Sequence, residues 1–382
     1  MAALRLCLQN VDVRIIDQHD EVLAQSFPVV LHPQSLRLLS EVGLSPTLLW
    51  QGRAVGRLAL YTDFERRAVL SFPARGTIPA GLMTLPRDAL RRALANELAR
   101  RGVRVEHGVR LASLEQDAGS ITGQLERREP GSEPPRARPT QLEAFEADFL
   151  IGADGYDSTT RAALGIELKE HGKLETFAFF DAPSGRGGQE AQLALGEEHI
   201  GSIYPLHYGS SRFSFQISRS LDQAPNRDTL KELLFARMPW YAEEPPICEW
   251  AGVAEFRRAL ATHFGVGRAW LAGEAAHLSG PLGVQSLNVG LDEATELADR
   301  IAHALQEPLS PNFGAHYEAK RMRQWRALLG LDVAVPSERS PEWARKHAPR
   351  LLPCLPASGV DLDDLLDQLR LSPRTEPPAW EE

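Results

Sequence analysis

The sequence "GRAWLAGEAAHLSGPLGVQSLNVGLDEATELA", residues Gly267–Ala298, decides the fold class of this chain. A short apolar stretch ends on Gly273 and Glu274, which is typical of a buried strand. A loop of small residues with Pro281 and Gly283 follows, and the periodicity after it predicts a long helix. Such a loop lets backbone amides and the end of a helix approach a planar ligand closely. We therefore predict an α/β fold with a ligand site at this strand end.

The sequence "DFLIGADGYDSTTRAAL", residues Asp148–Leu164, shows a similar arrangement. We expect a buried strand that brings Asp154 and Gly155 to its carboxyl end, where open parallel sheets bind ligands. Ser158, Thr159 and Thr160 could cap the helix that follows, and Arg161 is expected one to two turns into that helix. An ordinary strand–turn–helix with a capping aspartate would leave the same pattern, so both interpretations are open at this point.

Composition excludes several classes of protein. The 382 residues carry a net charge of −9 and no run of lysines and arginines, which argues against nucleic-acid binding. The three cysteines, Cys7, Cys248 and Cys354, are far apart and form no CxxC pair. We therefore expect no disulfide framework, no metal site and a reducing, cytoplasmic location. No apolar stretch reaches membrane-spanning length, and Met1 is not followed by a secretory signal.

The order of the predicted elements indicates three parts. Strands and helices alternate in residues 1–75, 76–171 and 263–330, which we expect to form one discontinuous ligand-binding domain. Alternating stretches such as "TFAFFDA" and "RFSFQIS" predict an antiparallel sheet domain over residues 172–262, with a helix at Asp228–Arg237. Residues 331–382 are expected to form a helical tail. The proline-rich stretch Arg127–Gln141 is expected to be a mobile loop without a catalytic role.

Together the two motifs resemble those of the FAD-dependent aromatic hydroxylases, the single-component flavoprotein monooxygenases of the p-hydroxybenzoate hydroxylase type. The resemblance covers most of residues 1–330 and rests on "GADGYDSTTR" and "LAGEAAHLSGPLGVQSLN" in this order. It implies a Rossmann-like FAD-binding domain with an inserted antiparallel β-rich substrate domain. It also implies that NAD(P)H reduces FAD and that O₂ then hydroxylates a small aromatic or quinone-like substrate. This chemistry requires neither a side-chain nucleophile nor a metal, and the sequence identifies no catalytic residue.

The resemblance implies roles for particular residues of this chain. Asp17 would bind the adenosine ribose, and Glu274, beside Gly273, would replace the aspartate that binds the ribityl chain. Arg87 in "LPRDAL" matches an arginine that begins a helix in the family. The segment that contacts the flavin nucleotide and the pyridine nucleotide contributes Asp154, Gly155 and Arg161. The residues that would line the flavin ring are Pro281, Gly283, Leu287 and Asn288.

Three positions depart from the family pattern. Glu274 has one methylene more than the usual aspartate, Gln34 stands where an arginine is frequent, and Ser286 replaces a glycine of the "GxN" turn. If Ser286 has a positive φ, we expect strain of about 1 kcal/mol there. Taken singly, His277 is expected to be a hydrogen-bonded structural histidine, and Asn288 could be only a helix cap.

The chain begins where the middle of a Rossmann unit is expected. "VDVRIID", residues Val11–Asp17, predicts the strand that ends on the ribose-binding acid, and Ala2–Gln9 predicts a short helix before it. The GxGxxG loop normally precedes this acid by about 20 residues. Counting back from Asp17 puts the loop at or before Met1. We therefore expect an N-terminally truncated fold without its first strand and loop, a start codon assigned too far downstream, and poor retention of FAD.

Other functions share part of this pattern. An FAD-dependent reductase or halogenase would have similar motifs, although the WxWxIP segment of halogenases is absent. A flavoprotein-like remnant with little FAD and no activity is a second alternative, and an NAD(P)-linked dehydrogenase is a third. In a hydroxylase the substrate would lie between the sheet domain and the flavin. Candidates to line its site, each of which could instead only fill a sheet face, are Tyr204, His207, Phe213 and Phe215.

Overall fold

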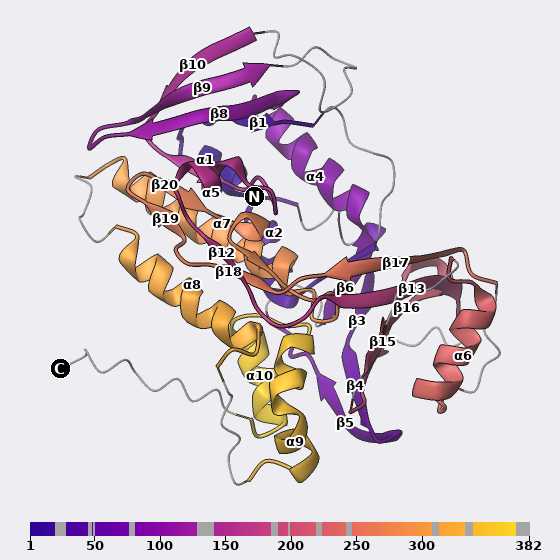
Figure 1. Ribbon diagram of the computed structural model, residues 1–382. Coiled ribbons are helices and arrows are strands. Elements are labelled where there is room, and N and C mark those ends of the chain that lie inside the picture. Colours follow the sequence, from indigo (N-terminus) through magenta and orange to yellow (C-terminus); the bar gives the residue numbers. More distant parts are fainter. Residues whose placement is uncertain are drawn as a thin grey trace.

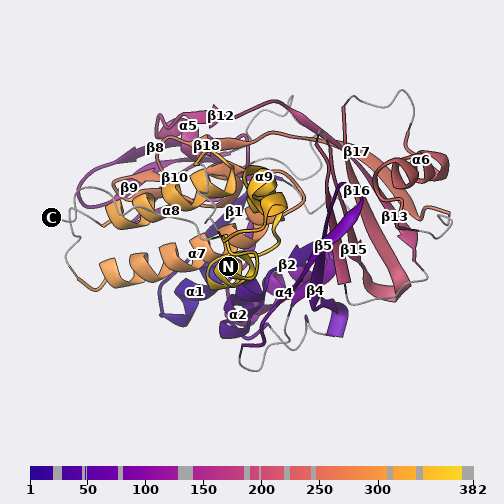
Figure 2. The ribbon, with the colours of Figure 1, turned by 90° about the horizontal axis from the view of Figure 1, so that it is seen from below.

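The computed structural model describes residues 1–19, 28–44, 48, 50–75, 81–127, 141–184, 190–197, 199–218, 224–241, 247–307, 313–332 and 339–371. The fold is α/β, as predicted, and most of its strand pairs are antiparallel (Figure 1). Figure 2 shows two halves side by side. One half holds the long helices α7 (Gln285–Ala304) and α8 (Ala315–Leu328), and the other holds a large sheet with α6 (Arg227–Arg237) on its outer side.

Two pairs of parallel strands lie in the helical half. β1 (Ile15–Asp17) pairs with β7 (Val105–His107), while β11 (Leu150–Gly152) pairs with β20 (Ala269–Leu271). Side chains of β1 and β11 pack against the same small hydrophobic cluster, but no described strand joins the two pairs through hydrogen bonds. The short strand β19 (Gly265–Val266) extends the second pair on the far side of β20.

The short helix predicted at Ala2–Gln9 and the long helix predicted after Gly283 both form, and two further helices accompany them. α7 packs against α1 (Ala2–Leu8) and α2 (Pro33–Glu41), and α4 (Arg87–Arg100) follows a strand of a small sheet. Gly43 and Gly102 have φ values of +89° and +80° just beyond α2 and α4. Each lets the chain turn back and hydrogen-bond to the last turn of its helix, which is the usual way for a glycine to end a helix.

Three small sheets surround these helices. The first is antiparallel and contains β2 (Pro28–Leu31), β6 (Leu82–Pro86) and β3 (Arg53–Val55). The second contains β8 (Val109–Gln116), β9 (Ile121–Arg127) and β10 (Gln141–Ala147), and the loop predicted between the last two, residues 128–140, lies outside the described residues. The third contains β12 (Leu168–Glu170), β18 (Ala259–Ala261) and β21 (His277–Leu278).

A seven-stranded sheet fills the other half. Its strands, in spatial order, are β17 (Trp250–Phe256), β13 (Glu175–Pro183), β16 (Ser210–Ile217), β15 (Ile200–Pro205), β14 (Glu190–Leu195), β4 (Arg57–Thr62) and β5 (Glu65–Ser71). Two of them, β4 and β5, come from a segment that precedes residues 172–262 by about one hundred residues. Side chains alternate between an outer face under α6 and an inner face that belongs to a larger core.

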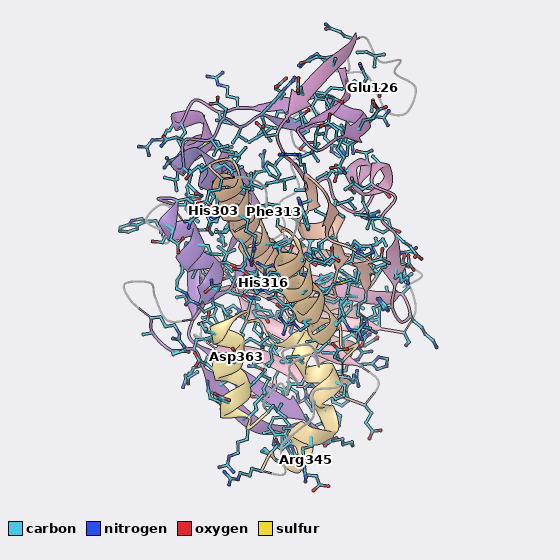
Figure 3. All side chains as sticks on the ribbon, turned by 90° about the vertical axis from the view of Figure 1, so that its left-hand side faces the viewer. Glu126, His303, Phe313, His316, Arg345 and Asp363 are labelled. Atoms are coloured by element: carbon cyan, nitrogen blue, oxygen red, sulfur yellow. The ribbon has the colours of Figure 1, made fainter. Side chains whose placement is uncertain are left out.

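The C-terminal segment completes this larger core. α9 (Glu342–Leu351), η3 (Leu352–Cys354) and α10 (Val360–Gln368) pack against the inner face of the sheet. In Figure 3, Arg345 of α9 and Glu126 of β9 mark opposite ends of the molecule. Asp361 anchors α10: its side chain is fully buried and accepts a 2.6 Å hydrogen bond from Arg37 of α2, with Arg75 3.6 Å away.

The Arg37–Asp361 pair gives a test of this anchoring. Arg37→Met leaves a buried carboxylate without its closest cation, so we expect the free energy of unfolding to fall by about 3 kcal/mol. Arg14→Met is the matched control, because Arg14 binds Glu106 and Glu143 on the surface. Its loss should lower the free energy of unfolding by less than about 1 kcal/mol. Urea denaturation followed by circular dichroism measures both variants. Equal losses would contradict the anchoring role of Asp361.

Candidate functional site

The parallel pair β11–β20 brings the two predicted motifs to one edge of the fold. Gly152 lies opposite Leu271 in the register, and the amide of Ala272 donates to the carbonyl of Gly152. Because the strands are parallel, the chain leaves both of them at the same edge. The turns that follow contain Asp154–Gly155 and Gly273–Glu274, so residues more than one hundred positions apart lie side by side.

Asp154 is bound within its own turn. One carboxylate oxygen accepts from the hydroxyl of Ser158 at 2.5 Å, and the other accepts from the amide of Thr160 at 2.9 Å and from two threonine hydroxyls. Ser158 in turn caps α5 (Thr159–Ala163) by accepting from the amide of Arg161. These bonds match the capping interpretation, and a contact between Asp154 and a cofactor stays a prediction.

Arg161 links the two motifs. It lies in the first turn of α5 rather than one to two turns into the helix, the position that the sequence had indicated. Its guanidinium donates to the carbonyl of Ala275 at 2.9 Å and to the carbonyl of Tyr156 at 2.7 Å. The arginine therefore ties the turn after β11 to the turn after β20.

Open space borders both turns. Gly155 and Gly273 have φ values of +77° and +64°, and a Cβ atom at either position would meet no atom within 4 Å. Glu274 follows in the short 3₁₀ turn η2 (Gly273–Ala275), where it is exposed and has no hydrogen bond or ion pair to any described residue. An unengaged carboxylate beside open space suits the hydroxyl groups of a sugar or ribityl chain, so the residues present fit FAD at this edge.

His277 is a hydrogen-bonded structural histidine, as predicted. It is fully buried, its Nε2 atom lies 2.8 Å from Glu293, and its ring stacks on Trp325 at 3.6 Å. Glu293 and Trp325 were not among the residues predicted from the sequence. A signal for Glu293 exists, because it falls between Val289 and Leu297 on the apolar face of the predicted helix.

The loop before α7 differs in detail from the prediction. Ser286 does not have a positive φ: it lies in the first turn of α7 and shares a 2.9 Å hydrogen bond with Ser279, so the expected strain does not arise. The residue with the left-handed conformation is Val284, at φ 50°, where the helix begins. The strain therefore falls two residues earlier than the family pattern suggested.

Asn288 is a buried connector rather than a helix cap. Its side-chain oxygen accepts from the amide of His32 at 2.8 Å and from the hydroxyl of Ser35 at 2.6 Å. Its side-chain nitrogen donates to the carbonyls of Val30 and Val284, both at 2.8 Å. All four bonds join α7 to β2, α2 and the loop, and they hold that loop in place.

The remaining predicted residues lie in different surroundings. Pro281, Gly283 and Leu287 belong to the same loop and helix start as Asn288. Asp17 ends β1 and accepts from the amide of His19, and Arg87 begins α4 with an exposed side chain. Within the described part of the chain, no hydrogen bond or ion pair connects Asp17 or Arg87 to the other predicted site residues.

The candidates for lining a substrate site divide between the two faces of the large sheet. Tyr204 lies on the inner face, and its hydroxyl donates to the carbonyl of Leu282 at 3.0 Å. Burial raises the pKa of Tyr204, so this hydroxyl keeps its proton. Phe213 and Phe215 pack under α6 on the outer face, which matches the interpretation that they only fill a face of the sheet. The alternation along β16 defines two faces but not which face is turned toward the loop.

Some kinds of site are absent from the described ranges. No helix there combines the length and apolar character needed to cross a bilayer. The same residues contain no group of three histidine, cysteine or carboxylate side chains that could hold a metal ion.

Two glycine turns at the ends of neighbouring parallel strands, bridged by an arginine, form the kind of strand edge at which open α/β sheets bind ligands. The chain belongs to the FAD-binding domain family, whose sequence profile matches residues 1–330. The predicted family and fold class are therefore confirmed.

Similar proteins agree with this assignment. The chain is 26 % identical over 341 residues to 6-methylpretetramide 4-monooxygenase of Streptomyces rimosus. The matched region covers 84 % of this chain and 56 % of that protein. Pentachlorophenol 4-monooxygenase of Sphingobium chlorophenolicum is 22 % identical over 337 residues, covering 86 % of this chain and 61 % of that protein. The chain thus spans less than two thirds of the length of these relatives. The solved structure of p-nitrophenol 4-monooxygenase PnpA from Pseudomonas putida DLL-E4 has the same fold, with a TM-score of 0.69, 16 % identity and coverage of 97 % and 95 % of the two chains.

Asn288→Ala tests the connector role. The change removes the acceptor of the buried His32 amide and the closer acceptor of the Ser35 hydroxyl, together with the donor to the carbonyls of Val30 and Val284, so we expect the free energy of unfolding to fall by about 3 kcal/mol. Ser286→Ala removes one hydroxyl bond two residues earlier in the same helix and should change stability by less than about 1 kcal/mol. Urea denaturation of the two variants measures the difference, and a small effect of Asn288→Ala would contradict this role.

His32 gives a prediction for pH. Burial lowers the pKa of His32 to about 3 in the folded chain, against about 6.5 when it is unfolded. The unfolded state therefore binds the extra proton first, and stability falls as the pH drops below about 6.5. Between about pH 7 and pH 5, protonation of His32 in the unfolded state should lower the free energy of unfolding by about 2 kcal/mol. This loss should be absent in His32→Gln and retained in His303→Gln, the control at an exposed histidine. Urea denaturation midpoints measured across this pH range test the prediction. A midpoint that depends on pH in His32→Gln as steeply as in the wild type would refute it.

Proposed function

We propose that this chain binds FAD and acts as an FAD-dependent monooxygenase, with NAD(P)H as reductant and O₂ as co-substrate. The observation that carries the proposal is the meeting of two turns, Asp154–Gly155 and Gly273–Glu274, at one edge of a chain that belongs to the FAD-binding domain family. The names of the two relatives support the reaction type, since they are a 6-methylpretetramide 4-monooxygenase and a pentachlorophenol 4-monooxygenase. FAD, when bound, supplies the redox chemistry, and the protein supplies binding, orientation and exclusion of water.

The family resemblance gives these residues roles that their surroundings allow. The exposed carboxylate of Glu274 would accept hydrogen bonds from ribityl hydroxyls, and Asp17 at the end of β1 would do the same for the adenosine ribose. Arg161 and Gly155 would border the pyrophosphate or the path of NAD(P)H, and Arg87 would lie near the same cofactor. The loop and helix start that would approach the flavin ring contain Pro281, Gly283, Leu287 and Asn288.

The substrate would lie between this loop and the inner face of the large sheet. Two contacts mark where they meet: Tyr204 binds the carbonyl of Leu282, and a Cβ atom at Gly280 would lie 3.4 Å from the carboxylate of Glu175. The inner face near Glu175 is aromatic, because Phe177, Phe179 and Phe256 pack with ring centroids 5.7 to 6.2 Å apart. Such a surface favours a small aromatic or quinone-like substrate.

Cofactor binding and oxygen consumption test the proposal together. The chain titrated with FAD should quench flavin fluorescence to saturation, and the complex should oxidise NADPH or NADH with uptake of O₂. Addition of a phenol that is a substrate should yield a hydroxylated product carrying label from isotopic O₂. NAD(P)H oxidation without O₂ uptake would indicate a reductase, and an absence of FAD binding would overturn the proposal.

Glu274→Ala should weaken FAD binding about tenfold or more, because one carboxylate acceptor for hydroxyl groups is lost. Glu167→Ala is the control, since Glu167 is also an exposed carboxylate but lies just before β12, away from the two turns. Fluorescence titration measures both dissociation constants. Equal affinities in the two variants would contradict the role of Glu274.

A further inference from the structure

A fully buried carboxylate supports the turn that carries Glu274. Glu293 lies on the inward face of α7, between Val289 and Leu297, and none of its side chain is exposed. An ionised group in such a position is stable only when donors satisfy both of its oxygens. The donors around Glu293 therefore show which segments its carboxylate joins.

Glu293 binds three donors from three different elements. Its Oε2 atom accepts from the amide of Gly273 at 2.9 Å and lies 2.8 Å from Nε2 of His277. Its Oε1 atom accepts from the indole N–H of Trp325 on α8 at 2.6 Å. Burial opposes ionisation, but attraction to His277 and to Arg321, together with these hydrogen bonds, holds the pKa of Glu293 below its ordinary value. The carboxylate therefore joins the turn, β21 and α8 in one cluster.

Three contacts outside this cluster also restrict the turn. Gly290 of α7 approaches closely, because a Cβ atom there would lie 3.3 Å from Cα of Gly273. The amide of Ala276 donates to the carbonyl of Gly273, and the carbonyl of Ala275 accepts from Arg161. The side chain of Glu274 has no partner among the described residues. Its direction is therefore set by the backbone of the turn.

We propose that Glu293 is a positioning residue: by holding the amide of Gly273 on the oxygen that also binds His277, it fixes the direction in which Glu274 meets FAD. The inference rests on the proposed function, in which Glu274 contacts the cofactor. Glu293 itself does not touch FAD and acts only through the turn.

Glu293→Gln is an informative variant because it keeps the shape of the side chain but replaces one acceptor oxygen with an NH₂ donor. If the amide nitrogen of the glutamine faces Trp325, two N–H groups meet; if it faces Gly273, the backbone amide loses its acceptor. In either orientation at least one buried donor is unsatisfied. Thr295→Val is the matched control, since Thr295 is also buried on α7 but only donates to the carbonyl of Leu291.

A double-mutant cycle distinguishes positioning from general support of the fold. Glu293→Gln should weaken FAD binding about tenfold in the wild-type background and no more than about twofold when Glu274→Ala is already present. Thr295→Val should leave the affinity unchanged. Equal weakening in both backgrounds, or wild-type affinity in Glu293→Gln, would overturn the proposal.

Hydrogen–deuterium exchange gives a readout that does not need FAD. In Glu293→Gln, the peptide that contains Gly273 should exchange faster than in the wild type and in Thr295→Val, while peptides of the large sheet should not change. Glu293→Ala removes both acceptor oxygens and should show the same change, and unchanged exchange at Gly273 in both variants would also overturn the proposal. If the wild-type chain binds no FAD, the proposed function fails, and the exchange measurement still decides whether Glu293 holds the turn.

Discussion

The parallel register of β11 and β20 is the constraint on which the site depends. Since Gly152 is opposite Leu271, the chain leaves both strands at the same level, and the turns after them share one edge. A shift of one residue in either strand would send its side chains to the opposite face and separate the two turns. The bond from Arg161 to the carbonyl of Ala275 requires this register, because it spans the gap between the two turns directly.

Local signals in the sequence predicted much of the fold. The period of α7 and the alternation of the sheet strands depend on a few neighbouring residues, so they could be recognised without tertiary information. The glycines that end α2 and α4 are local signals of the same kind. The pairing of β14 with β4 could not be recognised this way, because it joins segments more than one hundred residues apart. The same limit explains why the outward direction of Phe213 was missed: a strand pattern defines two faces, and only packing against α6 distinguishes them.

The candidate site shows where a family pattern stops being informative. Whether position 286 needs a positive φ depends on where the helix begins, and here the left-handed residue is Val284, just before the first residue of α7. Glu293 could have been noticed as a charge on an apolar helix face. Its donors could not have been identified, because Trp325 comes from a helix far along the chain and Gly273 contributes a backbone amide that carries no side-chain signal.

The C-terminal segment gives the loop before α7 a second support that lies beyond the family match at residues 1–330. The side chain of Gln285 donates to the carbonyls of Leu355 and Ala357, and Ser358 lies within hydrogen-bond distance of His32. A Cβ atom at Gly283 would lie 2.3 Å from the carbonyl oxygen of Pro353, although φ there is not positive. The glycine is thus needed for the close packing of the C-terminal segment. A residue expected to allow approach of the flavin ring also allows approach of this chain's own backbone, so the shape of the loop depends on residues on both sides of it.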